Sequence, residues 1–139
     1  MRPTRILLIE DNPITSKIVQ ITLESEGYSV LEASSGRSAI ELMSRTAPDL
    51  VLQDLILPDL DGVDLMRKLR DLPGGEHVPI LAFSGFYSTL EELKDNDAGF
   101  TDYVAKPIEP SVLLKTVGSY VRPTQGCSQG QPGSCTTME

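Results

Sequence analysis

Apolar runs typical of β-strands recur five times along the chain, with helical patterns between them. The runs are "RILLIE" (5–10), "YSVLEA" (28–33), "DLVLQD" (49–54), "VPILAF" (78–83) and "TDYVA" (101–105). Strands that are apolar almost throughout are typical of a parallel sheet covered by helices on both faces. The pattern therefore predicts a buried parallel sheet.

Five helices are predicted between and after these strands. In the first, Ile14, Ile18 and Ile21 recur at spacings of four and three, after Asn12 as the N-cap and Pro13 at the first helical position. The other four are marked by Ala39, Ile40 and Met43; by Gly62, Leu65, Met66 and Leu69; by Leu90 and Leu93; and by Leu113, Val117 and Val121 after Pro110.

Strands that alternate with helices at this pitch imply right-handed βαβ units. The predicted fold is α/β, a flavodoxin-like three-layer sandwich with a five-stranded parallel sheet in the order 2-1-3-4-5 and five helices. Residues 1–121 are expected to form this single domain. Residues 122–139 are rich in Gly, Ser, Pro, Gln and Thr, which predicts a disordered tail or the start of a linker.

Composition narrows the function classes. A formal net charge of -8 and a pI near 4.6 argue against direct nucleic-acid binding. No apolar stretch approaches the roughly 20 residues that span a bilayer, and the N-terminus does not fit a secretory signal. A cytoplasmic location without membrane insertion is therefore expected. Cys127 and Cys135 both lie in the tail without the company of a zinc site, and are expected to be free thiols.

Polar residues stand at the carboxyl ends of four predicted strands, where ligands bind in open α/β sheets. The first strand ends at Glu10 and Asp11, the third at Asp54, the fourth at Ser84 and the fifth at Lys106. Taken singly, the acids could cap a helix, and the serine and lysine could be ordinary surface residues. Three carboxylates on one edge repel one another and need a cation, and Mg²⁺ suits oxygen ligands.

This set of residue types also suits phosphoryl transfer. A carboxylate beside Mg²⁺ can attack phosphorus and become an aspartyl phosphate. The metal neutralises charge on the phosphoryl oxygens, and an ammonium and a hydroxyl can bind two of them. The five residues together predict a phosphoryl-accepting site.

Over residues 5 to 121, the sequence resembles the receiver domain of two-component response regulators. The motifs that carry the resemblance are "LLIEDN", "LVLQDLILPDLDG", "LAFSG" and "DYVAKP". The resemblance implies that Asp54 accepts the phosphoryl group and that Ser84 and Lys106 bind it. It also implies metal ligation by Glu10, Asp11, Asp54 and the main-chain carbonyl of Ile56.

Further roles follow from the same resemblance. Ser84 and Tyr103 take the positions of a conformational switch, and Lys106–Pro107 that of a cis peptide. Ile56 and Phe86 flank the approach of the water that hydrolyses the aspartyl phosphate. The sequence departs from the family pattern modestly, with Glu10 where aspartate is also common and Gly85 where alanine is frequent.

The expected function is a signalling module that is not an enzyme. Its expected partner is a histidine kinase or a histidine phosphotransfer protein, and its expected homodimer forms through the fourth helix, fifth strand and fifth helix. A flavodoxin is disfavoured because Glu10 and Asp11 would repel a flavin phosphate. An Mg²⁺-dependent phosphohydrolase with an aspartate nucleophile would carry a second acid where Ile56 stands. An unphosphorylated interaction module on the same fold is the remaining alternative.

Overall fold

All five predicted strands form one parallel sheet in the computed structural model, which describes residues 3–85, 99–106 and 109–122. The strands are β1 (Arg5–Ile9), β2 (Ser29–Ala33), β3 (Leu50–Asp54), β4 (Ile80–Ser84) and β5 (Asp102–Ala105). Their order in the sheet is β2-β1-β3-β4-β5, and every neighbouring pair is parallel. The predicted fold class and strand order are confirmed.

Four of the five predicted helices lie among the described residues. They are α1 (Pro13–Glu24), α2 (Gly36–Thr46), α3 (Gly62–Arg70) and α5 (Pro110–Gly118). The helix predicted around Leu90 and Leu93 lies outside the described residues, as do residues 123–139 of the predicted tail with its two cysteines.

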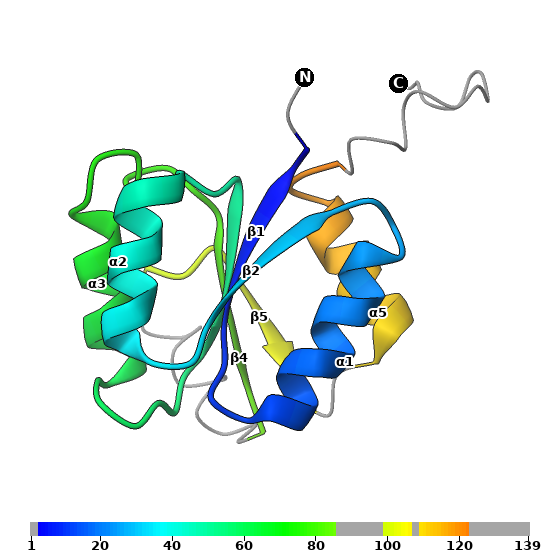
Figure 1. Ribbon diagram of the computed structural model, residues 1–139, viewed down its shortest axis with the longest axis horizontal. Helices are drawn as coiled ribbons and strands as arrows, with labels where there is room; N and C mark the ends of the chain where they lie inside the picture. Colours follow the sequence, from blue (N-terminus) through cyan, green and yellow to red (C-terminus); the bar gives the residue numbers. More distant parts are fainter. Residues whose placement is uncertain (1–2, 86–98, 107–108, 123–139) are drawn as a thin grey trace.

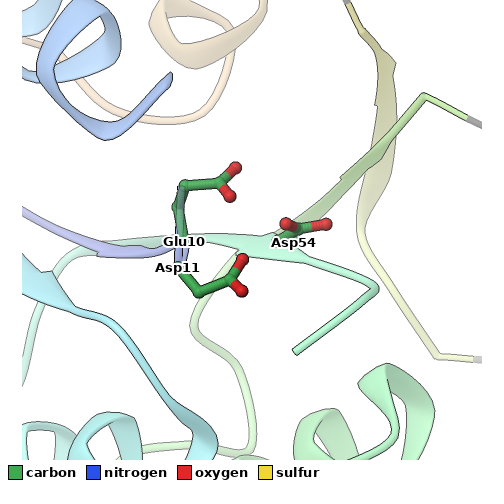
Figure 2. A group of neighbouring side chains, drawn as sticks. All are labelled: Glu10, Asp11 and Asp54. Carbon is green, nitrogen blue, oxygen red and sulfur yellow. The ribbon is translucent and has the colours of Figure 1, made fainter. Parts of the chain in front are cut away.

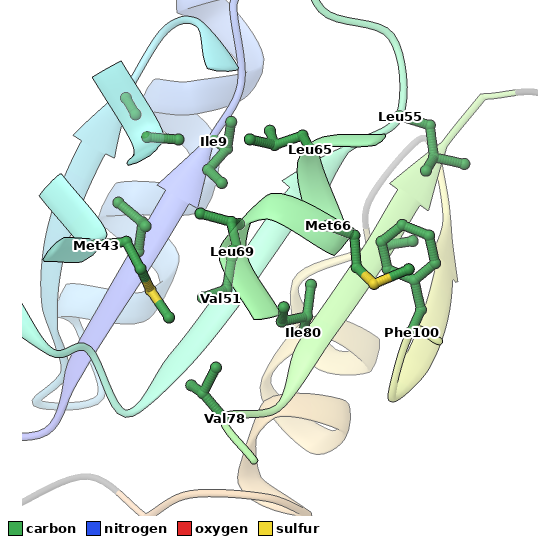
Figure 3. Close-up of a cluster of buried hydrophobic side chains, with 14 residues drawn as sticks. Ile9, Met43, Val51, Leu55, Leu65, Met66, Leu69, Val78, Ile80 and Phe100 are labelled. Atoms are coloured by element: carbon green, nitrogen blue, oxygen red, sulfur yellow. The ribbon is translucent and has the colours of Figure 1, made fainter. Parts of the chain in front are cut away.

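The helices cover the sheet on both faces (Figure 1). Helices α2 and α3 lie on one face, and α1 and α5 lie on the other. The core is accordingly split into two clusters of buried side chains. One joins Leu7, Ile9 and Val51 of the sheet to α2 and α3 (Figure 3), and the other joins the opposite sheet face to α1 and α5. Successive residues along a strand contribute their side chains to the two clusters in turn. The strands are therefore apolar almost throughout.

Polar side chains fix where α1 and α2 begin. Asn12 accepts hydrogen bonds from the main-chain N–H groups of Ile14 and Thr15, as the sequence predicted for the start of α1. Ser35 caps α2 in a reciprocal capping box with Ser38. These caps set the point at which the chain leaves the carboxyl edge of the sheet, and therefore hold the loops at that edge.

The apolar stripe of α1 faces solvent. Stripes of this spacing ordinarily mark the buried face of a helix. Here Ile14, Ile18 and Ile21 are 71%, 48% and 57% exposed. The buried side chains of the helix are Ser16, Val19 and Leu23. The pattern thus predicted the helix correctly, while its buried face is the opposite one.

Candidate functional site

Three carboxylates meet at the carboxyl edge of the sheet (Figure 2). Because β1 and β3 are neighbours, Glu10 and Asp11 at the end of β1 lie beside Asp54 at the end of β3. One oxygen of each residue lies within 4.8 Å of the others. Glu10 and Asp54 are only 3% and 4% exposed, while Asp11 is exposed. The edge therefore concentrates negative charge that is largely removed from water.

Lys106 reaches this cluster from the end of β5. Its Nζ atom lies 2.8 Å from Oε1 of Glu10 and 3.2 Å from Oδ2 of Asp54. The same atom lies 5.0 Å from the centroid of the Phe83 ring, within cation–π range. With one ammonium and three carboxylates, the cluster is net negative. This charge favours the binding of a divalent cation.

The pKa values of the cluster reflect burial and mutual charge. Burial raises the pKa of Glu10, and the hydrogen bond from Lys106 opposes that rise only in part. For Lys106, burial favours the neutral amine, but its bonds to Glu10 and Asp54 outweigh burial and raise the pKa. Lys106 is therefore a cation at neutral pH, which suits a phosphate-binding group.

Main-chain groups hold the two buried carboxylates in place. The second oxygen of Asp54, Oδ1, accepts a hydrogen bond of 3.1 Å from the N–H of Ile56. Oε2 of Glu10 accepts one of 3.0 Å from the N–H of Asn12. Each acid is thus bonded to Lys106 through one oxygen and to its own loop through the other, so that both side chains are oriented before any ligand binds.

The loop between β3 and α3 carries two more aspartates, and these serve a different purpose. Asp59 accepts hydrogen bonds from the N–H groups of Gly36 and Arg37 at the start of α2. Asp61 caps α3 through the N–H groups of Val63 and Asp64. Both bind helix N-termini, where a carboxylate is favoured by the free N–H groups and the helix dipole. Neither role was predicted from the sequence.

Gln53 is a second residue of the site whose role was not predicted from the sequence. It is fully buried beside Asp54 on β3, and its Nε2 donates to the carbonyl of Gly62 over 2.6 Å. A Cβ atom at Gly62 would lie 2.8 Å from the main chain of Leu55, so the loop closes tightly on the strand. The one signal in the sequence was an amide inside an otherwise apolar strand.

The remaining predicted site residues are partly placed. Ser84 is 2% exposed at the end of β4, and its carbonyl accepts a hydrogen bond of 2.9 Å from the N–H of Lys106. Tyr103 is half-buried and packs against the core cluster on the α2 and α3 side of the sheet, with its ring edge-on to Phe100 and the ring centroids 6.0 Å apart. Phe86 and Pro107 lie outside the described residues, so the predicted cis peptide and one of the two water-flanking positions stay predictions.

Residues 6–118 match the family model of the response regulator receiver domain. The chain belongs to this family. The expected α/β signalling module, as opposed to a catalytic enzyme, is thereby confirmed. A receiver domain accepts a phosphoryl group on an aspartate, and its partner is a histidine kinase.

Similar proteins agree with this assignment. The chain is 29% identical over 119 residues to the polar-differentiation response regulator DivK of Brucella anthropi, covering 86% of this chain and 97% of that one. It is 33% identical over 115 residues to an uncharacterised 14.6 kDa protein of Leptolyngbya boryana, covering 83% and 88%.

Solved structures also resemble this receiver domain closely. The receiver domain of the sensor histidine kinase PA1611 from Pseudomonas aeruginosa is 32% identical, with a TM-score of 0.77 over 86% of this chain and 98% of that one. That structure has a magnesium ion coordinated in its active-site cleft. The chemotaxis regulator CheY4 of Vibrio cholerae is 25% identical, with a TM-score of 0.79 over 86% and 100%. Within the described part of this chain, no helix is both long and apolar enough to cross a membrane.

Proposed function

We propose that Asp54 is the phosphoacceptor of this receiver domain and takes its phosphoryl group from a phosphohistidine of its partner. The observation that carries the proposal is the surroundings of the Asp54 carboxylate. One of its oxygens lies 3.2 Å from the ammonium of Lys106, and the carboxylate is grouped with Glu10 and Asp11 within 4.8 Å. A nucleophile, a cation-binding pair of acids and a fixed positive charge thus share one edge.

Each residue then has a role in the transfer. An oxygen of Asp54 attacks phosphorus while the bond from phosphorus to the histidine nitrogen breaks, and that nitrogen keeps the bonding electron pair. Lys106 and the hydroxyl of Ser84 bind phosphoryl oxygens, because a developing negative charge is stabilised by donors already in place. The burial of Asp54 lowers the local dielectric and strengthens these interactions.

The donor set at this edge fits Mg²⁺. Glu10, Asp11 and Asp54 offer only oxygen ligands, and the main-chain carbonyl of Ile56 is proposed as a further ligand. The net negative charge of the cluster and the magnesium ion in the related receiver domain of PA1611 support this choice. When bound, the ion neutralises charge on the phosphoryl group.

The wider setting of the domain belongs to the same proposal. A histidine phosphotransfer protein is an equally suitable donor, because it presents the same phosphohistidine. The domain bounds of 1–121 and 122–139, the cytoplasmic location and a homodimer through the fourth helix, β5 and α5 remain our predictions. Ser84 and Tyr103 are proposed to switch between two arrangements when the phosphoryl group arrives.

A phosphohydrolase is the nearest alternative, and Ile56 argues against it. An aspartate-nucleophile hydrolase needs an acid two residues after its nucleophile, and Ile56 presents a 56% exposed apolar side chain there. The intact acidic cluster likewise argues against an unphosphorylated interaction module, because an unused cluster of buried carboxylates would only destabilise the fold.

Intact-protein mass spectrometry tests the proposal directly. The protein is incubated with Mg²⁺ and a small acyl phosphate, and one added phosphoryl group is expected. Asp54→Asn should abolish the added mass, whereas Asp59→Asn, the same chemical change in the loop that follows β3, should retain it. Equal labelling of the wild type and Asp54→Asn would refute the assignment. Sustained turnover of phosphate monoesters would instead support the hydrolase.

A further inference from the structure

The buried amide of Gln53 has only part of its hydrogen bonding satisfied. Its Nε2 donates to the carbonyl of Gly62, whereas its Oε1 has no partner among the described residues. A buried acceptor without a partner destabilises a fold, and an apolar side chain of the same volume would avoid that cost. The stability of the core therefore does not account for an amide at this position, and the single bond that it donates needs another explanation.

That bond joins the two ends of the loop that follows the acceptor strand. Gln53 directly precedes Asp54 on β3, and Gly62 is the first residue of α3. Val51, two residues earlier on the strand, belongs to the core cluster under α2 and α3, so the side chain of Gln53 lies on the same face of the sheet. The amide thus ties the start of α3 to the end of β3, across the β3–α3 loop (residues 55–61).

Main-chain contacts close the same loop at its base. A Cβ atom at Gly62 would lie 2.8 Å from both the Cα atom and the carbonyl oxygen of Leu55, so the backbone touches itself where the loop begins and ends. One residue further in, Ile56 and Asp61 form an isolated antiparallel bridge. The bond from Gln53 adds a directional side-chain contact to this base, which fixes how the two ends sit against each other.

Ile56 lies within this closed base, and its main-chain groups face two demands. Its N–H donates to Oδ1 of Asp54 over 3.1 Å, and its carbonyl is the proposed main-chain ligand of Mg²⁺. Mg²⁺ requires nearly ideal octahedral geometry, so its affinity depends on how well each ligand is placed. Residues that orient a ligand without touching the metal therefore influence metal affinity strongly.

We propose that Gln53 is a positioning residue of the magnesium site. Its amide holds the start of α3 against β3, and the β3–α3 loop closed in this way orients the carbonyl of Ile56 for the metal. Gln53 itself contacts neither the metal nor the phosphoryl group. The inference rests on the proposed phosphoacceptor site and adds to it a residue from the opposite side of the strand that carries the acceptor.

Gln53→Met tests the proposal, because it removes the donor and keeps a similar volume. Titration of the amide resonances of the full chain with Mg²⁺ should give a dissociation constant about tenfold higher than that of the wild type, the lower end of the range for residues that orient metal ligands. The amide of Ile56 should also exchange with solvent faster in the metal-free protein, while the thermal midpoint changes little. Gln53→Leu, which also lacks a donor, should behave in the same way.

Ile80→Val is the matched control for a disturbed core. Ile80 is fully buried in the same cluster, but it lies at the start of β4 and has no bond to the loop. The variant should lower the thermal midpoint, because it removes a buried methylene group. Its affinity for Mg²⁺ and the exchange of the Ile56 amide should match those of the wild type. Weaker Mg²⁺ binding in Ile80→Val would show that any loss of packing disturbs the site, and would overturn the specific role of Gln53.

A double variant shows which ligand Gln53 acts on. In an Asp54→Asn background, Gln53→Met should weaken Mg²⁺ binding by the same factor as in the wild type, because changes that act on separate ligands add. An effect that disappears in this background would overturn the proposal, since Gln53 would then act through Asp54. Equal affinities of the wild type and Gln53→Met would overturn it as well and leave the proposed site intact. A wild type that does not bind Mg²⁺ would overturn both proposals.

Discussion

Lys106 lies 2.8 Å from Glu10, although 96 positions separate the two residues in the chain. The bond joins the ends of β5 and β1, with β3 and β4 between them in the sheet. It spans the acidic cluster, because the same ammonium also bonds Asp54. Lys106 is therefore the counter-charge of the cluster as well as a proposed phosphoryl ligand, and removing it should have two opposite effects.

The first prediction concerns Lys106→Ala. Mg²⁺ should bind several-fold more tightly, because a neighbouring positive charge no longer repels it. Phosphorylation by a small acyl phosphate should slow by about tenfold or more, because the phosphoryl oxygens lose a fixed cation. Calorimetric titration with Mg²⁺ and the rate of mass gain measure the two effects. Lys115→Ala, an exposed lysine on α5, is the matched control and should change neither. Weaker Mg²⁺ binding in Lys106→Ala would contradict this account of the charge balance.

A second prediction concerns the lifetime of the aspartyl phosphate. Ile56 is 56% exposed beside the site and cannot hydrogen-bond an attacking water. Phe86 is expected to flank the same approach. Ile56→Asn combined with Phe86→Glu should therefore speed loss of the phosphoryl group about tenfold, because positioning a water is worth about 1.4 kcal/mol of barrier. A single-turnover decay assay at saturating Mg²⁺ measures this, with each single variant as a control. Unchanged decay in the double variant would show that access is controlled elsewhere.

The proposed switch predicts a response that extends beyond the site. Binding of beryllofluoride, which mimics the phosphoryl group on Asp54, should draw the hydroxyl of Ser84 towards it and release Tyr103 from its present packing. Amide resonances across residues 84–106 should then shift, together with those next to the acceptor. Changes confined to the neighbours of Asp54 would indicate a passive phosphoryl carrier instead. Asp54→Asn should show no response at all.

Variants of Gln53 test how much its buried amide contributes to the stability of the fold. Among the buried side-chain nitrogen and oxygen atoms of the described residues, its Oε1 alone has no hydrogen-bond partner. Gln53→Met fills a similar volume and should change the free energy of unfolding by less than about 1 kcal/mol. The variant loses one hydrogen bond, but it also removes a buried acceptor oxygen that has no partner, and the two effects offset each other. Gln53→Ala should cost about 2–3 kcal/mol by leaving a cavity. Chemical denaturation measures both. A large loss in Gln53→Met would mean that the amide holds the loop in a way that packing cannot replace.

The last prediction concerns Asp59 and pH. Hydrogen bonds from the main-chain N–H groups of Gly36 and then Arg37 lower the pKa of this carboxyl. A lowered pKa in the folded state stabilises the fold above the unfolded value of about 3.9. That contribution is lost as the pH falls through the folded pKa. Asp59→Asn should therefore be less stable than the wild type at neutral pH, and the gap between their thermal midpoints should narrow below about pH 4. A constant gap would show that the charge of Asp59 is irrelevant.

The sequence by itself determined the local elements and the composition of the site. Runs of apolar residues set the strands, and Asn12, Pro13 and Ser35 set helix starts, because caps and strand propensity act between residues close in the chain. The site residues could also be identified from the sequence, because parallel strands bring their carboxyl ends to one edge of the sheet. Their spacing in the chain therefore predicted the acidic cluster that the fold assembles.

The tertiary structure alone decided which surfaces and partners these elements use. The apolar stripe of α1 predicts a helix equally well whichever face packs on the sheet. Here Val19 and Leu23 pack on it, because the connections to β1 and β2 fix the rotation of the helix, and Ile18 is left in solvent. Asp59 lies in the same loop as the metal-binding edge, yet the free N–H groups of α2, more than twenty residues earlier in the chain, take its carboxylate. Contacts between distant segments depend on how complete elements pack, and a local pattern carries no record of that packing.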